Sequence, residues 1–309
     1  MAQEYAKVLI ALRIPFIVVG RSEERCEEFR NKYSTVDVYS GGIEFFFDTH
    51  KDIFFSEAIV AVTVLELKNC TEYLIKNGIK KILLEKPAGL NYNEIQELNN
   101  CSKLYNADVC VAYNRRFYSS VLTAKSLIEK EGGITSFFFE FTEWGYKIAS
   151  LPIPENVKQN WFLANSSHVV DLAFHIGGYP KELSSYIAGS LSWHSKASRF
   201  AGAGVCENDV LFSYCANWNA PGRWGVEVLT NENRYIFRPM EKLSKISKGS
   251  VLVEEVEIDD SLDTEFKPGL FLQTKAFLEN DFSRFCTLQE QKENIEKYYL
   301  KMCGYLSNG

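Results

Sequence analysis

The sequence lacks any long apolar run. None of its hydrophobic segments approaches the roughly 18–20 residues that a membrane-spanning helix needs, and its first residues do not show the charged, apolar and small-residue regions of a secretion signal. These absences argue against a membrane partner and predict a cytoplasmic protein. The 309 residues, 46% of them hydrophobic, are enough for two domains that each have a core.

Basic clusters and cysteine pairs are missing as well. The 34 Lys and Arg residues are outnumbered by 40 Asp and Glu, and no basic and aromatic stripe follows the pattern of a phosphate-backbone site, which argues against nucleic acid as a partner. The eight cysteines are scattered, with no C-x-x-C pair and no histidine at ligand spacing. We therefore expect buried, reduced thiols and no metal site.

Helical and strand patterns alternate over residues 1–114. Amphipathic helices are expected at 1–13, 22–33, 67–78 and 91–106, and short buried strands at 16–20, 57–64, 80–87 and 107–114. Strands that alternate with helices form a parallel sheet with helices on both faces. Residues 1–114 are therefore predicted to form an α/β domain with a doubly wound, Rossmann-type parallel sheet.

The chain begins with a helix where this fold needs a strand. Tyr5, Val8, Leu9 and Leu12 make an apolar stripe that must pack on a sheet, so the first strand and its loop are expected to be absent from the given sequence. We interpret Met1 as an internal start, preceded by about a dozen residues with a strand and a G-x-G-x-x pattern. Without that strand, the chain is expected to bind a dinucleotide weakly and to aggregate through the open slot.

The pattern changes from residue 115 onwards. A helix at 119–132 precedes strand candidates at 134–147, 182–191, 209–218, 225–230, 234–239 and 250–258, and a helical region follows at 269–304. Residues 115–309 are predicted to form an α+β domain with a mostly antiparallel, open sheet.

Parallel α/β sheets bind ligands at the carboxyl ends of their strands. Arg21, Ser22 and Arg25 follow the strand at 16–20, where dinucleotide-binding folds place an acid on the ribose or a base on a 2′-phosphate, and no acid occurs before Glu23. These residues form a candidate phosphate clamp, and an ordinary helix cap is the alternative.

Lys86 comes after Glu85 and the predicted strand residues KKILL at 80–84. A partly buried lysine at this edge can exchange a proton or hold a substrate hydroxyl, and Pro87 biases Lys86 toward an extended backbone. The alternative is a solvated lysine before a turn.

The segment NSSHVVDLAFHIGG at 165–178 carries a second candidate. As a helix it places Asp171 and His175 on one face, with His168 one turn earlier. Imidazole titrates near neutrality, which suits a group that takes a hydroxyl proton while hydride leaves carbon. A zinc site and a core histidine are the alternatives.

Together, these stretches resemble the Gfo/Idh/MocA family of oxidoreductases, which includes glucose-fructose oxidoreductase and inositol dehydrogenase. The matching stretches are LLEKPAG at 83–89, AYNRRF at 112–117, SSHVVDLAFHIGG at 166–178 and CTLQEQKENIEKYY at 286–299. The resemblance implies a Rossmann domain, a second domain whose open sheet joins subunits into a homodimer or homotetramer, and nicotinamide-dependent redox chemistry on sugars, polyols or their derivatives.

The resemblance also assigns roles to individual residues. The catalytic residues would be Lys86, Asp171 and His175. The cofactor would contact Arg21, Ser22, Arg25, Thr63, Val64, Glu85, Lys86 and Asn114. The substrate would contact Tyr113, Arg115, Arg116, Trp161 and His168.

Three features depart from the family pattern. The glycine-rich fingerprint that should precede Ala2 is missing. Thr63 and Val64 stand where members often have Thr-Pro. Ser166 and Ser167 replace paired glycines. The last change indicates a substrate pocket that differs from that of the sugar dehydrogenases that define the family.

We expect an oxidoreductase that uses NAD or NADP, with NADP preferred, and transfers a hydride to or from a secondary alcohol or ketone of a sugar, polyol or nucleotide sugar. Arg115, Arg116 and His168 suit an anionic group such as a carboxylate or a nucleotide diphosphate. The alternatives are a regulatory protein of the same fold, which senses a dinucleotide or sugar without turnover, and an inactive, truncated member. The presence of Lys86, Asp171 and His175 favours the enzyme.

Overall fold

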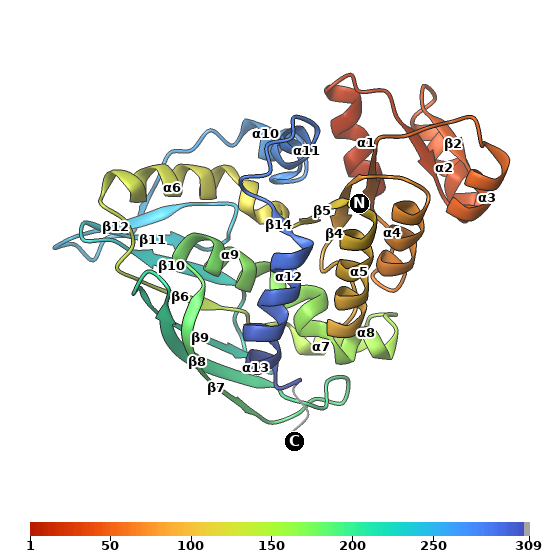
Figure 1. The fold of residues 1–309 in the computed structure, drawn as a ribbon. Helices are drawn as coiled ribbons and strands as arrows, with labels where there is room; N and C mark the ends of the chain where they lie inside the picture. The colour runs from red at the N-terminus through yellow and green to blue at the C-terminus, as the bar shows by residue number, and fades with distance from the viewer. Residues whose placement is uncertain (306–309) are drawn as a thin grey trace.

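Helices and parallel strands alternate through the first part of the chain (Figure 1). The computed structural model describes residues 1–305. Its first elements are α1 (Ala2–Ala11), β1 (Ile17–Val19), α2 (Glu23–Lys32), β2 (Asp37–Tyr39), α3 (Gly42–Thr49), β3 (Glu57–Val60), α4 (Leu67–Lys76), β4 (Lys81–Glu85), α5 (Tyr92–Tyr105) and β5 (Asp108–Ala112). β3, β4 and β5 pair in parallel, as do β1 and β2, which confirms the predicted Rossmann-type architecture.

The parallel strands fall into two separate sheets. β1 and β2 form one sheet, and the other has the order β14-β5-β4-β3, in which β14 spans Cys286–Thr287. Within residues 1–305, β1 pairs only with β2 and β3 only with β4, so each strand keeps one unpaired edge. The prediction that the strand at 16–20 is fully buried is therefore wrong, because Ile17, Val18 and Val19 are only half-buried beside the open edge.

Both faces of the larger parallel sheet are covered. Alternate residues of β4 and β5 pack against α4 and α5 in one core. The others, Leu83, Cys110 and Ala112, pack against α1 and against α11 (Leu270–Leu278) in a second core. Tyr5 and Val8 of α1 are buried in this second core, which confirms the apolar stripe predicted for the first helix.

An eight-stranded sheet forms the centre of the second part. Its order is β13-β12-β11-β10-β6-β9-β8-β7, and all neighbours are antiparallel except β6 and β9. The mostly antiparallel sheet predicted after residue 115 is thus confirmed. The elements of this part are η1 (Asn114–Phe117), α6 (Ser119–Lys130), β6 (Ser136–Glu140), α7 (Gly145–Ser150), α8 (Glu155–Gln159), η2 (Phe162–Ser166), α9 (Ser167–Gly177), β7 (Pro180–Ala188), β8 (Arg199–Cys206), β9 (Leu211–Asn217), β10 (Gly225–Leu229), β11 (Asn233–Phe237), β12 (Ser244–Ser247) and β13 (Glu254–Glu255).

Four strands escape prediction, β2, β8, β12 and β14, and one predicted strand is nearly absent. β8 reads RFAGAGVC, which has little strand propensity. A Cβ atom at Gly202 would lie 2.4 Å from the Tyr214 ring, so glycine is needed for close packing against β9. β12 was likewise not expected. The strand expected at 250–258 shrinks to β13, and Val251 beside it is 94% exposed.

The last part of the chain adds a strand to the four-stranded sheet that contains β3, β4 and β5. Its elements are α10 (Ser261–Glu265), α11, β14 (Cys286–Thr287), α12 (Leu288–Asn294), η3 (Ile295–Tyr299) and α13 (Leu300–Cys303). β14 pairs with β5, α12 contacts α5, and α13 contacts β7 and β8, so this segment lies between the two large sheets (Figure 1). The predicted domain boundary at residue 114 therefore stays a prediction. It assigns β14 to the second domain, although β14 pairs with β5 of the first. Within the described part of the chain, no helix has the length and apolar composition to span a membrane.

Candidate functional site

Lys86 lies at the carboxyl end of β4 and reaches the second part of the chain. Its Nζ donates a hydrogen bond to the carbonyl oxygen of Ala164 in η2, at 2.7 Å. Burial lowers the pKa of Lys86 to about 8, although the charge of Glu85 acts in the opposite direction. The η2 turn is π-helical, and such turns are frequent at functional sites. Lys86 is thus an anchored amine whose pKa is lowered toward neutrality.

Glu85, the residue before this lysine, is held by the first helix. The Tyr5 hydroxyl donates a hydrogen bond to Oε1 of Glu85 at 2.8 Å, and both side chains are buried. Burial raises the pKa of Glu85, whereas the Tyr5 hydrogen bond and the Lys86 charge lower it. The contact fixes the start of α1 against the carboxyl end of β4.

His168 is the histidine beside Lys86. It stands one helical turn beyond Ala164, whose carbonyl oxygen accepts the Lys86 hydrogen bond. Burial and the positive charges of Arg115, Lys86 and Lys267 hold the pKa of His168 well below its usual value. Its Nδ1 atom is buried without a hydrogen-bond partner among residues 1–305. The site therefore contains a neutral imidazole with an unused ring nitrogen.

Tyr113 forms a wall against this imidazole. Its ring lies edge-on to His168, with 5.9 Å between ring centres. Its hydroxyl is hydrogen-bonded to Gln291, which also donates to the carbonyl oxygen of Pro87 at 3.1 Å. Through Gln291, α12 thus fixes both Tyr113 and the residue after Lys86.

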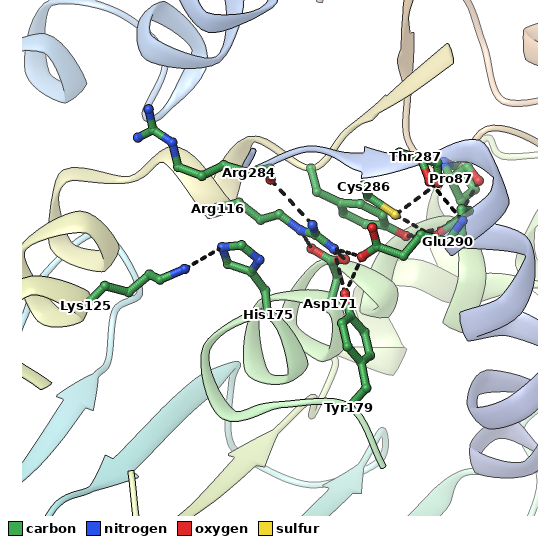
Figure 2. Close-up of polar contacts among 12 residues, drawn as sticks. Pro87, Arg116, Lys125, Asp171, His175, Tyr179, Arg284, Cys286, Thr287 and Glu290 are labelled. Carbon is green, nitrogen blue, oxygen red and sulfur yellow. Dashed lines mark hydrogen bonds and ion pairs between the residues drawn. The ribbon is translucent and has the colours of Figure 1, made fainter. Parts of the chain in front are cut away.

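Asp171 lies further along α9, in a buried ionic cluster (Figure 2). Arg116 donates to both Asp171 carboxylate oxygens, at 2.6 and 2.9 Å. The same guanidinium binds Glu290 at 3.0 Å and the Tyr179 hydroxyl at 3.1 Å. Asp171 is fully buried and Arg116 is 2% exposed. These contacts join η1, α9 and α12, and they occupy both residues.

His175 lies on the far side of the same cluster. Its Nε2 is 3.3 Å from the Lys125 amine (Figure 2). Burial and the positive charges of Arg116, Lys125 and Arg284 lower the pKa of His175 to about 2. The Lys86 charge acts on His168 and not on His175, and the Ala164 carbonyl oxygen that binds Lys86 lies one turn before His168, so His168 is the nearer of the two histidines to Lys86. No group of three or more His, Cys, Asp or Glu side chains in residues 1–305 is arranged to hold a metal ion.

The predicted phosphate clamp follows the carboxyl end of β1 and contacts the turn after β3. Ser22 caps α2, because its Oγ accepts a hydrogen bond from the Arg25 backbone N–H at 3.4 Å. Arg21 forms an ion pair with Glu66 at 3.2 Å, with side chains 79% and 43% exposed. Glu66 also closes the turn that begins at Thr63 and Val64, by donating its N–H to the Thr63 carbonyl oxygen. The pair therefore links the two strand ends, and its exposure leaves the Arg21 guanidinium accessible.

Two other predicted site residues, Asn114 and Trp161, contact other residues of the chain. The Asn114 amide donates to the Pro268 carbonyl oxygen at 2.9 Å. Trp161 is buried with its ring 6.1 Å from that of Trp193, and its Nε1 has no partner among the described residues. Their roles toward cofactor and substrate stay predictions.

Four residues near Lys86 and His168 were not predicted. They are Glu143, Arg223, Trp224 and Lys267. Glu143 is buried and accepts hydrogen bonds from Asn165, Ser166 and Arg223, at 2.8–2.9 Å. The only sequence signals were a charged residue within an aromatic segment, for Glu143, and Arg-Trp directly after Pro-Gly, for Arg223 and Trp224.

Solved structures share this fold across nearly the whole chain. UDP-N-acetylglucosamine 3-dehydrogenase from Acidithiobacillus ferrooxidans is 12% identical, with 98% of this chain and 93% of that chain covered and a TM-score of 0.72. Levoglucosan dehydrogenase, in complex with NADH and levoglucosan, is 16% identical, with 94% and 89% covered and a TM-score of 0.72. A super-repressor mutant of Gal80p from Saccharomyces cerevisiae is 12% identical, with 97% and 92% covered and a TM-score of 0.76. No family model matches the chain, and no curated protein matches it by sequence. At these identities, the similarity establishes the fold.

Proposed function

We propose that the chain is a divergent member of the Gfo/Idh/MocA family and an oxidoreductase that uses a nicotinamide dinucleotide. It would transfer a hydride to or from a secondary alcohol or ketone of a sugar, polyol or nucleotide sugar. The observation that carries this proposal is the placement of Lys86, with a pKa of about 8, against the turn that leads into His168. The two sugar dehydrogenases among the structural neighbours support it.

The carboxyl ends of the parallel strands fit a dinucleotide. Arg21 at the end of β1, Thr63 and Val64 after β3, and Glu85 and Lys86 at the end of β4 lie along one edge, and the Arg21–Glu66 ion pair bridges the first two strand ends. Arg21 and Arg25 would hold phosphate, and Lys86 would lie at the reacting end. When bound, the nicotinamide accepts or donates the hydride.

Lys86 and His168 can manage the proton of the reacting hydroxyl. A general base works best when its pKa is near the working pH, which favours the Lys86 amine over the much less basic His168. The Ala164 carbonyl oxygen accepts one N–H of Lys86 and so leaves its remaining positions for the substrate. The unused Nδ1 of His168 is available for a hydrogen bond with the substrate. We therefore propose that Lys86 exchanges the proton, the role that the sequence suggested for His175, and that His168 orients the hydroxyl.

Titration with NADPH and NADH, followed by a screen of sugars, polyols and nucleotide sugars for a change in dinucleotide absorbance, tests this function. Turnover of a secondary alcohol or its ketone supports it. Dinucleotide binding with no turnover across the screen would instead favour a regulatory role, which the Gal80p neighbour keeps open.

We also propose a preference for NADPH over NADH. Arg21 stands at the end of β1 with an accessible guanidinium, and a hydrogen bond from a charged group contributes about 1.5–3 kcal/mol. NADPH is therefore expected to bind about tenfold or more tightly than NADH, and Arg21→Ala is expected to remove most of that difference in a calorimetric titration. Arg13→Ala, in the exposed loop before β1, is the matched control and should keep it. Equal affinities in the parent chain would contradict the preference.

A homodimer or homotetramer through the open sheet is proposed as well. Phe212 of β9 packs on Phe174 of α9, so residues of the opposite pleat point away from that helix. On the outward face, Tyr186 is 73% and Leu211 is 58% exposed. Replacing both residues with Glu is expected to yield monomers in light scattering, whereas Phe54→Glu, at a residue 90% exposed elsewhere, should leave the assembly intact. A monomeric parent chain would contradict this proposal.

A further inference from the structure

The site contains a guanidinium without a counterion. Arg115 of η1 has its guanidinium carbon 4.9 Å from the centre of the Trp224 ring and 5.9 Å from that of Tyr118. Its Nε is buried without a hydrogen-bond partner, and Arg115 forms no ion pair among residues 1–305. Burial lowers the pKa of Arg115, which shows that its charge is partly desolvated. A desolvated charge without a partner is costly unless a ligand supplies one.

A second guanidinium lies over the same indole ring. The guanidinium carbon of Arg223 is 4.5 Å from the centre of Trp224 and 5.1 Å from that of Trp144. One N–H of Arg223 donates to Glu143 at 2.8 Å, and the side chain is 45% exposed, so its other N–H groups face outward. Trp224 therefore carries two cationic groups on its ring.

The acidic residues nearby are already engaged. Glu143 uses one oxygen for Arg223 and the other for Asn165 and Ser166. Glu85 accepts from Tyr5. Glu241 acts on Arg115 only through its charge, because no hydrogen bond or ion pair joins the two in the described part of the chain. Lys86, Arg115, Arg223 and Lys267 outnumber these three carboxylates, and Asp171, whose charge also interacts with Arg115, is paired with Arg116.

Apart from Nδ1 of His168, the unused polar groups around Trp224 are all hydrogen-bond donors. They are Nε of Arg115, Nε1 of Trp224 and the outward N–H groups of Arg223. A carboxylate or a phosphoryl group only accepts hydrogen bonds and is negatively charged, so it matches this set in both respects. A neutral hydroxyl would leave the excess charge in place. Arg116 is not part of the set, since Asp171, Glu290 and Tyr179 occupy its guanidinium.

We infer that the substrate carries an anionic group, a carboxylate or a phosphoryl group, which binds between Arg115 and Arg223 at Trp224. This inference rests on the proposed function, because it places the group on the molecule that reacts at Lys86. The His168 and Trp224 ring centres are 6.3 Å apart, so one sugar ring spans the distance from the reacting hydroxyl to the anion site. Arg223 and Trp224 precede β10 of the eight-stranded sheet, whereas the dinucleotide edge belongs to the parallel strands.

Calorimetric titration with three sugars tests the inference. Glucose, glucuronate and glucose 6-phosphate share a pyranose ring and differ in charge, so the two anionic sugars separate a carboxylate site from a phosphoryl site. At least one anionic sugar is expected to bind about tenfold or more tightly than glucose, the effect of one charge-assisted contact. Arg115→Met should abolish that preference. Because Arg115 forms no ion pair among the described residues, the substitution leaves no carboxylate unpaired, so the variant should stay folded, as a thermal melt would verify.

A matched variant controls for general loss of charge. Arg234 also forms an ion pair, with Glu227, and lies over an aromatic ring, that of Phe138, on the same sheet. Arg234→Met should keep the anionic preference, and Arg223→Met should weaken it. Equal binding of all three sugars by the parent chain, binding of none, or a preference that survives both Arg115→Met and Arg223→Met would overturn the inference. The titrations are run with and without NADP⁺, so failure of the dinucleotide to bind counts against the proposed function and leaves the sugar comparison valid.

Discussion

Replacing Lys86 with Met is expected to lower turnover by about 10²–10⁴-fold, the usual contribution of a positioned acid or base. Met is an unbranched side chain one atom shorter than Lys, and it lacks the amine that binds the Ala164 carbonyl oxygen. Dinucleotide affinity should change little, because the phosphates bind at the other strand ends. Single-turnover measurements at saturating dinucleotide isolate the chemical step.

The two histidines of α9 provide a matched pair of variants. His168→Asn is expected to reduce turnover strongly, since the unused Nδ1 lies at the site. His175→Asn is expected to keep turnover close to that of the parent, because its ring faces Lys125. The reverse result would return the catalytic role to His175, as the sequence pattern favoured.

The pH profile gives Lys86 a second readout. Its pKa is lowered to about 8, so the amine is protonated below that pH and cannot accept a proton. The rate of alcohol oxidation should therefore rise with pH through about 8 and level off above it, while the rate of ketone reduction should fall over the same range. Lys86→Met should remove the inflection. A profile without an inflection near pH 8 in the parent would assign the proton to another group.

Local patterns account for most of the fold. The stripe of α1 and the period-two alternation of β9 are set by residues a few positions apart, and these elements formed where they were predicted. The burial of β1 depends on which strand lies beside it, and no local pattern reports that. The sequence does not predict β8 because its glycines are needed for packing against the aromatic rings of β9, which come later in the chain.

The candidate site shows the same limit. His168, Asp171 and His175 share one helix face at spacings of three, four and seven, so periodicity alone does not tell which end of α9 meets Lys86. The deciding contact joins residues 86 and 164. Glu143 and Arg223 meet across 80 positions in the chain. This ion pair forms because β6 and β10 are neighbours in the eight-stranded sheet, and the spacing of residues in the sequence does not predict that strand order.

Asp171→Ala is expected to destabilise the protein by about 3–5 kcal/mol, the cost of removing one partner from a buried ion pair. The variant leaves Arg116, which is 2% exposed, with Glu290 as its only carboxylate. The free energy of unfolding in urea measures this loss. The matched control is Asp260→Ala, which removes an exposed ion pair with Lys242 and is expected to cost no more than about 1 kcal/mol.

A double variant separates the burial of charge from the loss of packing at this position. Replacing Arg116 with Met and Asp171 with Leu removes both charges and fills the space with apolar groups, so it should lose less stability than the two single variants together. Glu290 can then turn to solvent, because its side chain is already 29% exposed. Turnover per folded molecule in Asp171→Ala should fall far less than in Lys86→Met. If Asp171→Ala instead unfolded like the parent chain while its turnover fell by about 10²-fold or more, this carboxylate would take part in the chemistry, and Arg116 would serve to position it.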